Sequence, residues 1–314
     1  MSRVLVTGGA GFVGSHLCQA LLARSDQVVC FDNLSTSDGK NLAILEASPG
    51  FTFVREDVTK GIAIPGKIDV VVHLASPASP PDYMRLPLET LAVGSRGTEA
   101  CLQLAKRDDA RFLFASTSEI YGNPLVHPQP EDYWGNVSST GPRSVYDEAK
   151  RFGEALAMAY SRYESVNVGI VRIFNTYGPR LRRGDGRVVS NFVSQALSGQ
   201  PLTIYGDGHQ TRSFCYVDDL VAGLLAMMDH HDFVGPVNLG NPQEISVTEL
   251  ARRILGLTGS TSALEYSPAP EQDPVRRQPD ITLAKEKLGW SPKVLLEDGL
   301  ERTVDWFREQ ISQF

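Results

Sequence analysis

The sequence has few cysteines and no clustered metal-binding side chains. Its 314 residues include 6 histidines and 4 scattered cysteines, with no Cys-x-x-Cys pair. We therefore expect reduced, packed cysteines, without a disulfide framework and without a metal site. Positive charge is also scarce, since the formal net charge is −7. This balance disfavours nucleic acid and anionic membranes as partners, so an anionic substrate would have to meet locally placed arginines.

Long apolar runs are missing as well, although 42% of the residues are hydrophobic. No stretch approaches the length of a membrane span, and the first residues lead directly into an expected strand, not into a signal peptide. We expect no membrane association and a cytoplasmic location. The length allows a full core and exceeds one minimal doubly wound domain, which predicts a nucleotide domain with a smaller lobe.

A glycine-rich turn follows the first apolar segment. Residues 3–7 form a β-branched run, and Gly8-Gly9-Ala10-Gly11-Phe12-Val13-Gly14 then leads into an amphipathic stretch over 15–22. This strand, turn and helix are typical of a dinucleotide site. Gly8 permits the turn, Gly11 lets a pyrophosphate approach the helix N-terminus, and Gly14 allows close helix packing. The candidate cofactor contacts in this segment are Gly8, Gly11, Phe12 and Val13.

Acidic residues follow the next two expected strands. The strand over 27–31 ends at Asp32, whose carboxylate is placed to accept hydrogen bonds from the adenosine ribose hydroxyls. Asn33 follows, and no basic residue adjoins it, which favours NAD over NADP. A third strand over 51–55 leads to Asp57-Val58, where the carboxylate could hold the adenine amino group or only cap the strand end.

Two further strands bring small and polar side chains to one edge of the expected sheet. The strand over 68–75 ends in small residues, as the floor beneath a nicotinamide ribose requires. The proline-rich loop over 76–83 lies where open α/β sheets bind ligands. The strand over 111–116 delivers Thr117-Ser118-Glu119 to the same edge. The candidate cofactor contacts here are Leu74, Ala75 and Ser76.

Tyr146 and Lys150 are four residues apart, so they share one face of a helix. An ammonium beside a phenol favours the phenolate, which makes Tyr146 a plausible proton acceptor near neutral pH. A lone pair of this kind also arises by chance on a solvated helix face. Its significance here depends on the glycine turn and on Thr117.

These segments together resemble the extended short-chain dehydrogenase/reductases over essentially the full chain, and within them the UDP-glucuronate decarboxylases, or UDP-xylose synthases. The matching segments are 73–81, 115–119, 131–135, 172–180, 185–192 and 210–214. The resemblance implies an α/β fold, a Rossmann-like doubly wound parallel sheet with a smaller C-terminal substrate-binding lobe. Residues 1–171 and about 214–240 would form the NAD-binding domain, and residues 172–213 and 241–314 the nucleotide-sugar lobe.

Two positions depart from the pattern of this family. Gly94 stands where the family usually has an asparagine, and Val145 where relatives often carry another small residue before the tyrosine. We expect the first departure to change the local helix geometry near the cofactor, because a side-chain hydrogen bond is lost. We expect the second to have no effect.

The resemblance also implies a reaction, the conversion of UDP-glucuronate to UDP-xylose. A hexuronic acid loses CO₂ only after oxidation at C4, because the C5 carbanion is otherwise not delocalised. Tyr146 would accept the C4 hydroxyl proton while NAD⁺ accepts the hydride, and Thr117 would position the hydroxyl. Glu119 would hold the sugar or a water that reprotonates C5, or merely cap a turn. The candidate catalytic residues are Tyr146, Lys150, Thr117, Glu119, Ser118 and Arg277.

Related enzymes of the superfamily differ at the same segment. Ser118 replaces the aspartate that 4,6-dehydratases use as an acid, and the equivalent of Glu119 in 4-epimerases is usually small or apolar. By resemblance, Arg212 is the best phosphate ligand and Arg277 lies near the sugar carboxylate; Tyr205 could stack on the uracil or only pack. The candidate substrate contacts are Pro80, Tyr83, Asn175, Arg180, Arg187, Val188, Asn191, Tyr205, Arg212 and Arg277.

Three alternatives stay open at this point. One is a decarboxylase that releases UDP-4-keto-pentose and NADH, another is a UDP-sugar 4-epimerase, and the last is a non-catalytic NAD-binding regulator. The apolar faces expected over 88–105 and 150–163 predict a homodimer, although burial in the core would produce the same pattern.

Overall fold

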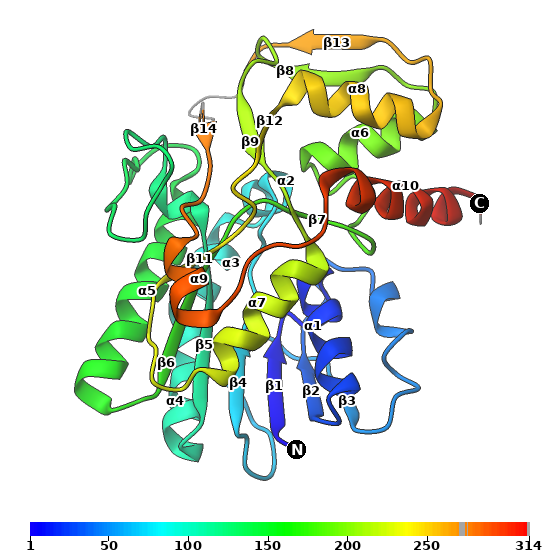
Figure 1. Cartoon of the computed structure of the whole chain (residues 1–314). Coiled ribbons are helices and arrows are strands. Elements are labelled where there is room, and N and C mark those ends of the chain that lie inside the picture. The colour runs from blue at the N-terminus through cyan, green and yellow to red at the C-terminus, as the bar shows by residue number, and fades with distance from the viewer. Residues whose placement is uncertain (270–273, 275, 313–314) are drawn as a thin grey trace.

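The computed structural model describes residues 1–269, 274 and 276–312. Seven parallel strands form the central sheet in the order β11-β6-β5-β4-β1-β2-β3 (Figure 1). The order 3-2-1-4-5-6 is that of the Rossmann fold, here with one strand added at an edge. The bounds are β1 (Arg3–Thr7), β2 (Gln27–Phe31), β3 (Phe51–Val54), β4 (Val70–His73), β5 (Arg111–Thr117), β6 (Val168–Ile173) and β11 (Val237–Leu239).

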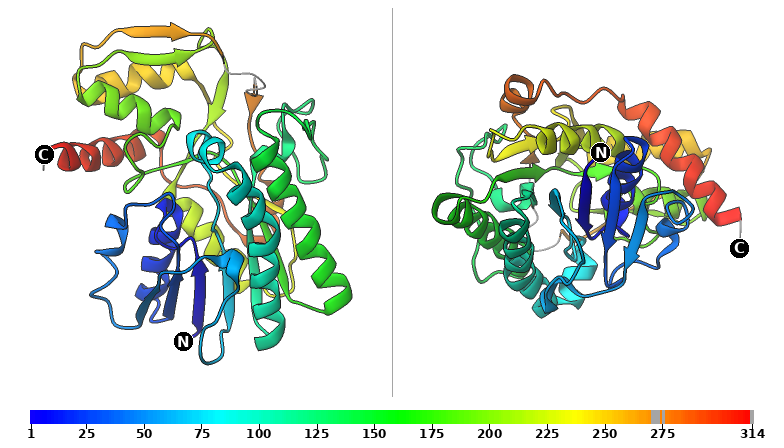
Figure 2. Two further views of the ribbon diagram at one scale, coloured as in Figure 1. Left: turned by 180° about the vertical axis from the view of Figure 1, so that it is seen from behind. Right: turned by 90° about the horizontal axis from the view of Figure 1, so that it is seen from below.

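Helices cover both faces of this sheet. On one face lie α1 (Phe12–Ala23) and α7 (Val217–Asp229), and on the other lie α4 (Thr98–Asp108) and α5 (Ser144–Glu164) (Figure 2). Side chains alternate along a strand, so Val4 and Val6 join the first of these cores while Leu5 joins the second. Burial on both faces explains why the strands are almost uniformly apolar.

The smaller lobe lies beyond the carboxyl ends of the sheet strands (Figure 1). Its parallel pair β8–β13 and three-stranded sheet β12-β9-β14 pack with α6, α8 and α10. The pairing of β9 with β14 sets Arg212 beside Arg277. The bounds are α6 (Val188–Leu197), β8 (Leu202–Tyr205), β9 (Thr211–Ser213), β12 (Glu244–Ser246), α8 (Val247–Thr258), β13 (Leu264–Ser267), β14 (Arg276–Arg277) and α10 (Leu296–Ser312).

Short elements connect the longer helices and strands. Their bounds are η1 (Lys40–Leu42), η2 (Val58–Lys60), α2 (Pro80–Arg85), α3 (Pro87–Ala92), η3 (Val93–Gly97), η4 (Ser118–Tyr121), β7 (Thr176–Tyr177), β10 (Cys215–Tyr216) and α9 (Thr282–Leu288). The predicted NAD-binding domain, residues 1–171 with about 214–240, and the predicted nucleotide-sugar lobe, residues 172–213 with 241–314, remain predictions in their exact bounds. Within the second lobe, residues 270–273, 275 and 313–314 lie outside the described part of the chain.

The helix expected over 88–105 is interrupted in its middle. Residues Val93–Gly97 form a π-helical turn between α3 and α4. A Cβ on Gly94 would lie 2.6 Å from Ala149 Cβ and 2.7 Å from Ala149 O on α5. The missing side chain therefore allows this turn to pack directly on the helix that carries Tyr146 and Lys150.

Two further observations concern the surroundings of the chain. Among the described helices, none combines the length and the apolar character that crossing a bilayer requires. Cys18, Cys30, Cys101 and Cys215 are all buried and unpaired, which confirms the prediction that they are packing residues.

Candidate active site

A cavity of about 1260 Å³ opens at the carboxyl ends of the central strands. Parallel strands expose their carboxyl ends on one edge of a sheet, and ligands bind there in open α/β folds. Every candidate cofactor, catalytic and substrate residue named from the sequence lines this cavity. The fold thus brings the predicted site residues together around one cavity.

The turn between β1 and α1 leaves no room for side chains. Gly8 has φ +72°, and a Cβ there would lie 2.7 Å from Ala75 N; a Cβ on Gly14 would lie 2.2 Å from Gly8 O. Gly11 is the N-cap of α1, and no side chain caps this helix end. Its first N–H groups can therefore receive an anion such as a pyrophosphate, with Phe12 and Val13 lining the cavity beside it.

Two carboxylates line the cavity just beyond the ends of β2 and β3. Asp32 accepts hydrogen bonds from Ala10 N at 3.1 Å and Leu34 N at 2.8 Å, while burial raises its pKa. Asp57 accepts from Thr59 N at 2.9 Å and Thr59 Oγ1 at 2.7 Å. Asp57 therefore does cap a turn, one of its two predicted roles. The glycine turn and these acids fit NAD.

Tyr146 and Lys150 share one buried face of α5, as the spacing predicts. Lys150 Nζ donates to Ala115 O at 2.8 Å and lies 6.0 Å from the Tyr146 ring centroid. Burial lowers the pKa of Lys150 to about 8. Burial also raises the pKa of Tyr146 to about 12, against the opposing effects of a hydrogen bond with Thr117 and the Arg187 charge.

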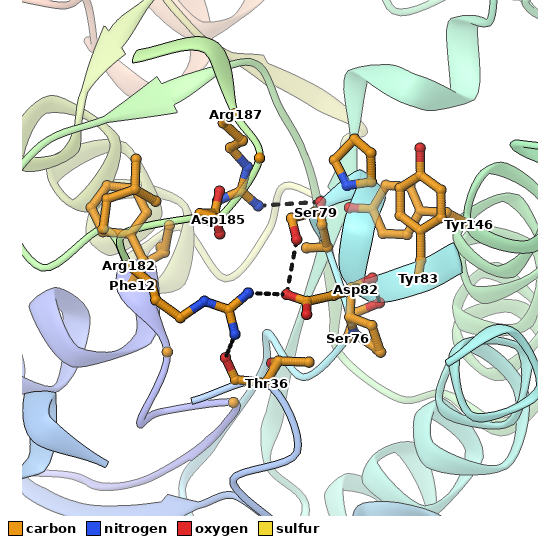
Figure 3. Close-up of a pocket in the computed structure, with 18 of the residues that line it drawn as sticks. Phe12, Thr36, Ser76, Ser79, Asp82, Tyr83, Tyr146, Arg182, Asp185 and Arg187 are labelled. Carbon is orange, nitrogen blue, oxygen red and sulfur yellow. Dashed lines mark hydrogen bonds and ion pairs between the residues drawn. The ribbon is translucent and has the colours of Figure 1, made fainter. Parts of the chain in front are cut away.

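The expected phenolate is thus not favoured by Lys150 alone, because desolvation of Tyr146 outweighs nearby positive charge. The ring of Tyr83 stacks on the Tyr146 ring, with centroids 5.2 Å apart and planes at 8° (Figure 3). This stacking fixes the phenol within the cavity.

Arg182 connects the two sides of the cavity. Its guanidinium donates to Thr36 O at 2.9 Å and to Asp82 Oδ2 at 2.9 Å (Figure 3). Ser79 Oγ donates to the same Asp82 carboxylate at 2.8 Å, and these contacts lower its pKa in spite of burial. Sequence patterns do not predict this link, since the three segments are far apart in the chain.

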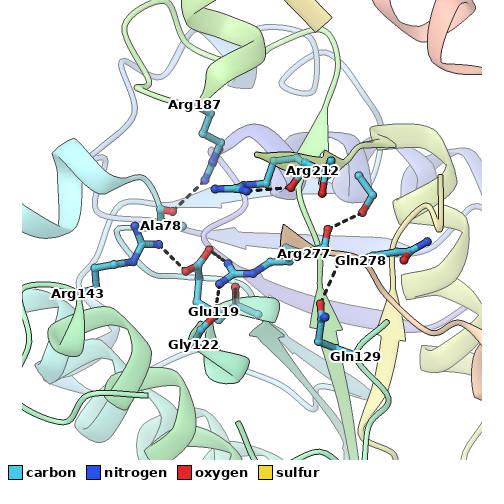
Figure 4. A network of polar contacts seen from close by, with 12 residues as sticks. Ala78, Glu119, Gly122, Gln129, Arg143, Arg187, Arg212, Arg277 and Gln278 are labelled. Atoms are coloured by element: carbon cyan, nitrogen blue, oxygen red, sulfur yellow. Dashed lines mark hydrogen bonds and ion pairs between the residues drawn. The ribbon is translucent and has the colours of Figure 1, made fainter. Parts of the chain in front are cut away.

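Glu119 lies between two arginines. Arg143 and Arg277 each donate to its carboxylate, and Arg277 Nη2 also donates to Gly122 O at 2.9 Å (Figure 4). Both charges outweigh desolvation and lower the pKa of Glu119 to about 2. Arg277 is only 3% exposed, so this is a buried charge cluster. Glu119 therefore stays ionised at any physiological pH.

Arg143 was not among the sequence candidates. It stands at the N-cap of α5, three residues before Tyr146, so helical spacing could have placed it near that phenol. Its contact with Glu119 could not have been found in this way, because it depends on how η4 packs against α5.

Other arginines line the wall formed by the smaller lobe. Arg180 Nη1 is buried without a hydrogen-bond partner among the described residues. Arg187 donates to Ala78 O at 3.2 Å and pairs with Asp185, while Arg212 donates to Thr211 O at 2.9 Å (Figure 4). This wall suits an anionic ligand. Tyr205, 48% exposed, lies at its rim.

The sheet order, the glycine turn and the Tyr–Lys pair define a Rossmann-type enzyme of the extended short-chain dehydrogenase/reductase class. Residues 4–240 match the model of the "NAD dependent epimerase/dehydratase family", and the chain belongs to that family. Its cofactor is accordingly NAD.

The chain is similar to named enzymes and to proteins of known structure. UDP-glucuronic acid decarboxylase 1 of Arabidopsis thaliana is 52% identical over 98% of this chain and 70% of its own length. UDP-glucuronic acid decarboxylase 1 of Xenopus tropicalis is 50% identical over 99% of this chain and 73% of its own. The crystal structure of UDP-glucuronic acid 4-epimerase from Bacillus cereus, with UDP-glucuronic acid and NAD, has a TM-score of 0.88, 31% identity, and coverage of 98% and 99%.

Proposed function

We propose that this chain decarboxylates UDP-glucuronate to UDP-xylose. The observation that carries the proposal is the ionised Glu119, held by Arg143 and Arg277 at the same sheet edge as Thr117 and Tyr146. Elimination from C6 would require an acid near Ser118, whereas decarboxylation requires control of the C4 oxygen and of C5. The high identity with two UDP-glucuronic acid decarboxylases supports the same conclusion.

The reaction begins with oxidation at C4, because a C4 ketone is the electron sink for loss of CO₂. NAD, when bound, supplies the hydride acceptor and later the hydride donor. Tyr146 accepts the C4 hydroxyl proton, and Thr117, hydrogen-bonded to Tyr146, orients that hydroxyl. The ammonium group of Lys150, which donates to Ala115 O, lies over the phenol ring of Tyr146. Thr117, Tyr146 and Lys150 are all buried, which limits the access of bulk water to them.

The second half of the reaction proceeds from a β-keto acid. Loss of CO₂ leaves an enolate whose C4 oxygen accepts hydrogen bonds from Tyr146 and Thr117. Glu119 orients the water that reaches C5, while Arg277 holds Glu119 in place and ionised. Reduction at C4 then gives the pentose and restores the starting state of the enzyme. No net oxidation results.

The nucleotide is held by the smaller lobe in this proposal. Arg180, Arg187 and Arg212 bind the pyrophosphate, Tyr205 stacks on the base, and Asn175 contacts the sugar. The remaining substrate contacts are Pro80, Tyr83, Val188 and Asn191, and all of them line the cavity. We retain the proposed division into an NAD-binding domain and a nucleotide-sugar lobe.

We also propose a homodimer in the cytoplasm. Leu88 and Leu91 on α3 are 75% and 40% exposed, and Phe152 on α5 is 51% exposed. These two helices are in contact, so their apolar side chains form a surface that a second copy would cover. The buried, reduced cysteines suit a reducing compartment.

The test is to incubate the purified protein with UDP-glucuronate, with and without added NAD⁺, and to follow CO₂ and the nucleotide sugar by NMR. At pH 6 the proposal predicts one UDP-xylose for each CO₂. Accumulation of UDP-4-keto-pentose with stoichiometric NADH would instead establish the releasing decarboxylase. Formation of a C4 epimer without CO₂ would establish the epimerase, and no turnover of any UDP-sugar would indicate a non-catalytic regulator.

A further inference from the structure

A second, smaller cavity lies directly behind the charge cluster. Its volume is about 290 Å³, which is room for several water molecules at roughly 30 Å³ each. Four residues line both this chamber and the main cavity, and so form the partition between them. These residues are Glu119, Arg143, Pro274 and Arg277.

Asp147 lines the chamber but not the main cavity. It follows Tyr146 on α5 and is 6% exposed, and its Oδ1 is buried without a hydrogen-bond partner within the described part of the chain. A buried carboxylate oxygen without a hydrogen-bond partner makes the charged form of the group costly. None of the reaction steps proposed for Tyr146, Thr117, Lys150 and Glu119 uses Asp147.

The charged and titratable groups around Asp147 come from several elements. Among the residues that the structure describes, they are Tyr83 on α2, Glu119 on η4, Arg143 before α5, Tyr146 and Glu148 on α5, and Arg277 on β14. Desolvation and then Glu119 raise the pKa of Asp147 to about 7, against the opposing arginines. Glu119, with its pKa lowered to about 2, is an anion and cannot store a proton near neutral pH.

Decarboxylation needs a stored proton. A carboxylate leaves as neutral CO₂ while C5 gains a C–H bond, so each turnover consumes one proton. We propose that Asp147 supplies this proton to C5 through water in the chamber and past Glu119, an inference that rests on the proposed function. The chamber is then the route by which protons enter, while the main cavity is closed by substrate.

Protonation of C5 is one of three linked proton transfers. The enolate electron pair forms the new C5–H bond with a proton of the water next to Glu119. That water recovers a proton from the Asp147 carboxyl group through the intervening chamber water. The Asp147 carboxylate is reprotonated from bulk solvent through the chamber opening. Asp147 acts through other groups and does not touch the substrate.

The experiment compares the wild type with Asp147→Asn, and measures CO₂, UDP-xylose and UDP-4-keto-pentose between pH 6 and 9. General acid catalysis contributes about 10²–10⁴-fold, so without Asp147 the enolate has time to leave the site, and it then gains its C5 proton in solution as UDP-4-keto-pentose. We therefore expect Asp147→Asn to form at least about tenfold less UDP-xylose per CO₂, with UDP-4-keto-pentose making up the difference. In the wild type this ratio falls as pH rises through about 7, because Asp147 then loses its proton. In Asp147→Asn the ratio does not vary with pH.

The matched control is Glu148→Gln, which removes the neighbouring carboxylate, 3.6 Å from Arg151 and outside the chamber lining. It gives the wild-type ratio of one UDP-xylose per CO₂ at pH 6, and the ratio falls at higher pH as it does in the wild type. Asp147→Glu keeps the carboxyl group, retains the fall with pH, and carries the test if Asp147→Asn does not fold. One UDP-xylose per CO₂ at every pH in Asp147→Asn overturns the inference, even if turnover is slower. A wild type that releases no CO₂ overturns the proposed function instead.

Discussion

Replacing Glu119 with glutamine should destabilise the protein, and the size of the effect follows from the charge cluster. The carboxylate is 17% exposed, and its two arginines lower its pKa from an ordinary 4.5 to about 2. At about 1.36 kcal/mol per tenfold change in proton affinity, the native ion contributes roughly 3 kcal/mol at pH 7. Removing the carboxylate that pairs with the buried Arg277 gives a similar figure, about 3–5 kcal/mol.

The pH dependence gives this prediction its sign. A carboxyl group whose pKa is lowered on folding stabilises the protein above its unfolded pKa, and this stability is lost as pH falls through the folded pKa. The difference between wild type and Glu119→Gln should therefore shrink from roughly 3 kcal/mol at pH 7 to about 1.5 kcal/mol at pH 3.

The assay is urea unfolding at both pH values, with Glu148→Gln as the control. The Glu148 carboxylate is 37% exposed in its pairing with Arg151, so its loss should cost under about 1 kcal/mol. A Glu119→Gln protein that loses no more than this control at pH 7, or whose deficit is the same at pH 3, would refute the reasoning.

Three other substitutions test separate parts of the site. Tyr146→Phe should lower turnover by at least about 10²-fold in a rate assay while calorimetry shows unchanged UDP binding, and normal activity would contradict its role as the proton acceptor. Lys150→Met should abolish turnover yet raise the free energy of unfolding at pH 7 by roughly 1–3 kcal/mol, because burial lowers the pKa of Lys150 and so makes its charged form costly. This gain in stability should shrink above pH 8, where the native Lys150 loses its proton. A less stable Lys150→Met protein at pH 7 would contradict the argument. Gly14→Ala should abolish NAD binding in a fluorescence titration, since its Cβ would meet Gly8 O. The control Gly256→Ala, whose Cβ would have nothing within 4 Å, should bind NAD normally and gain up to about 1 kcal/mol in the free energy of unfolding. Equal NAD binding by the two variants would contradict the packing argument.

Local sequence patterns predicted the nucleotide-binding half well. The strand over 3–7, the glycine turn and Asp32 lie where expected because their geometry depends on neighbouring residues. The shared face of Tyr146 and Lys150 follows from helical spacing in the same way.

Long-range contacts could not be predicted from such patterns. The Arg182–Asp82 pair spans 100 residues, and the contact of Arg277 with Glu119 spans 158. Asp147 is a clearer case, because a charged residue beside an inward-facing tyrosine is ordinarily expected on the solvated side of its helix. Its burial depends on the cluster formed by η4, the start of α5 and β14.

The most direct test of the closed redox cycle is to follow deuterium placed at C4 of UDP-glucuronate through a complete turnover in ordinary water. The account predicts UDP-xylose that retains the C4 deuterium, because oxidation and reduction occur at the same carbon within one turnover. Product without the C4 label, or UDP-4-keto-pentose in place of UDP-xylose, would contradict it.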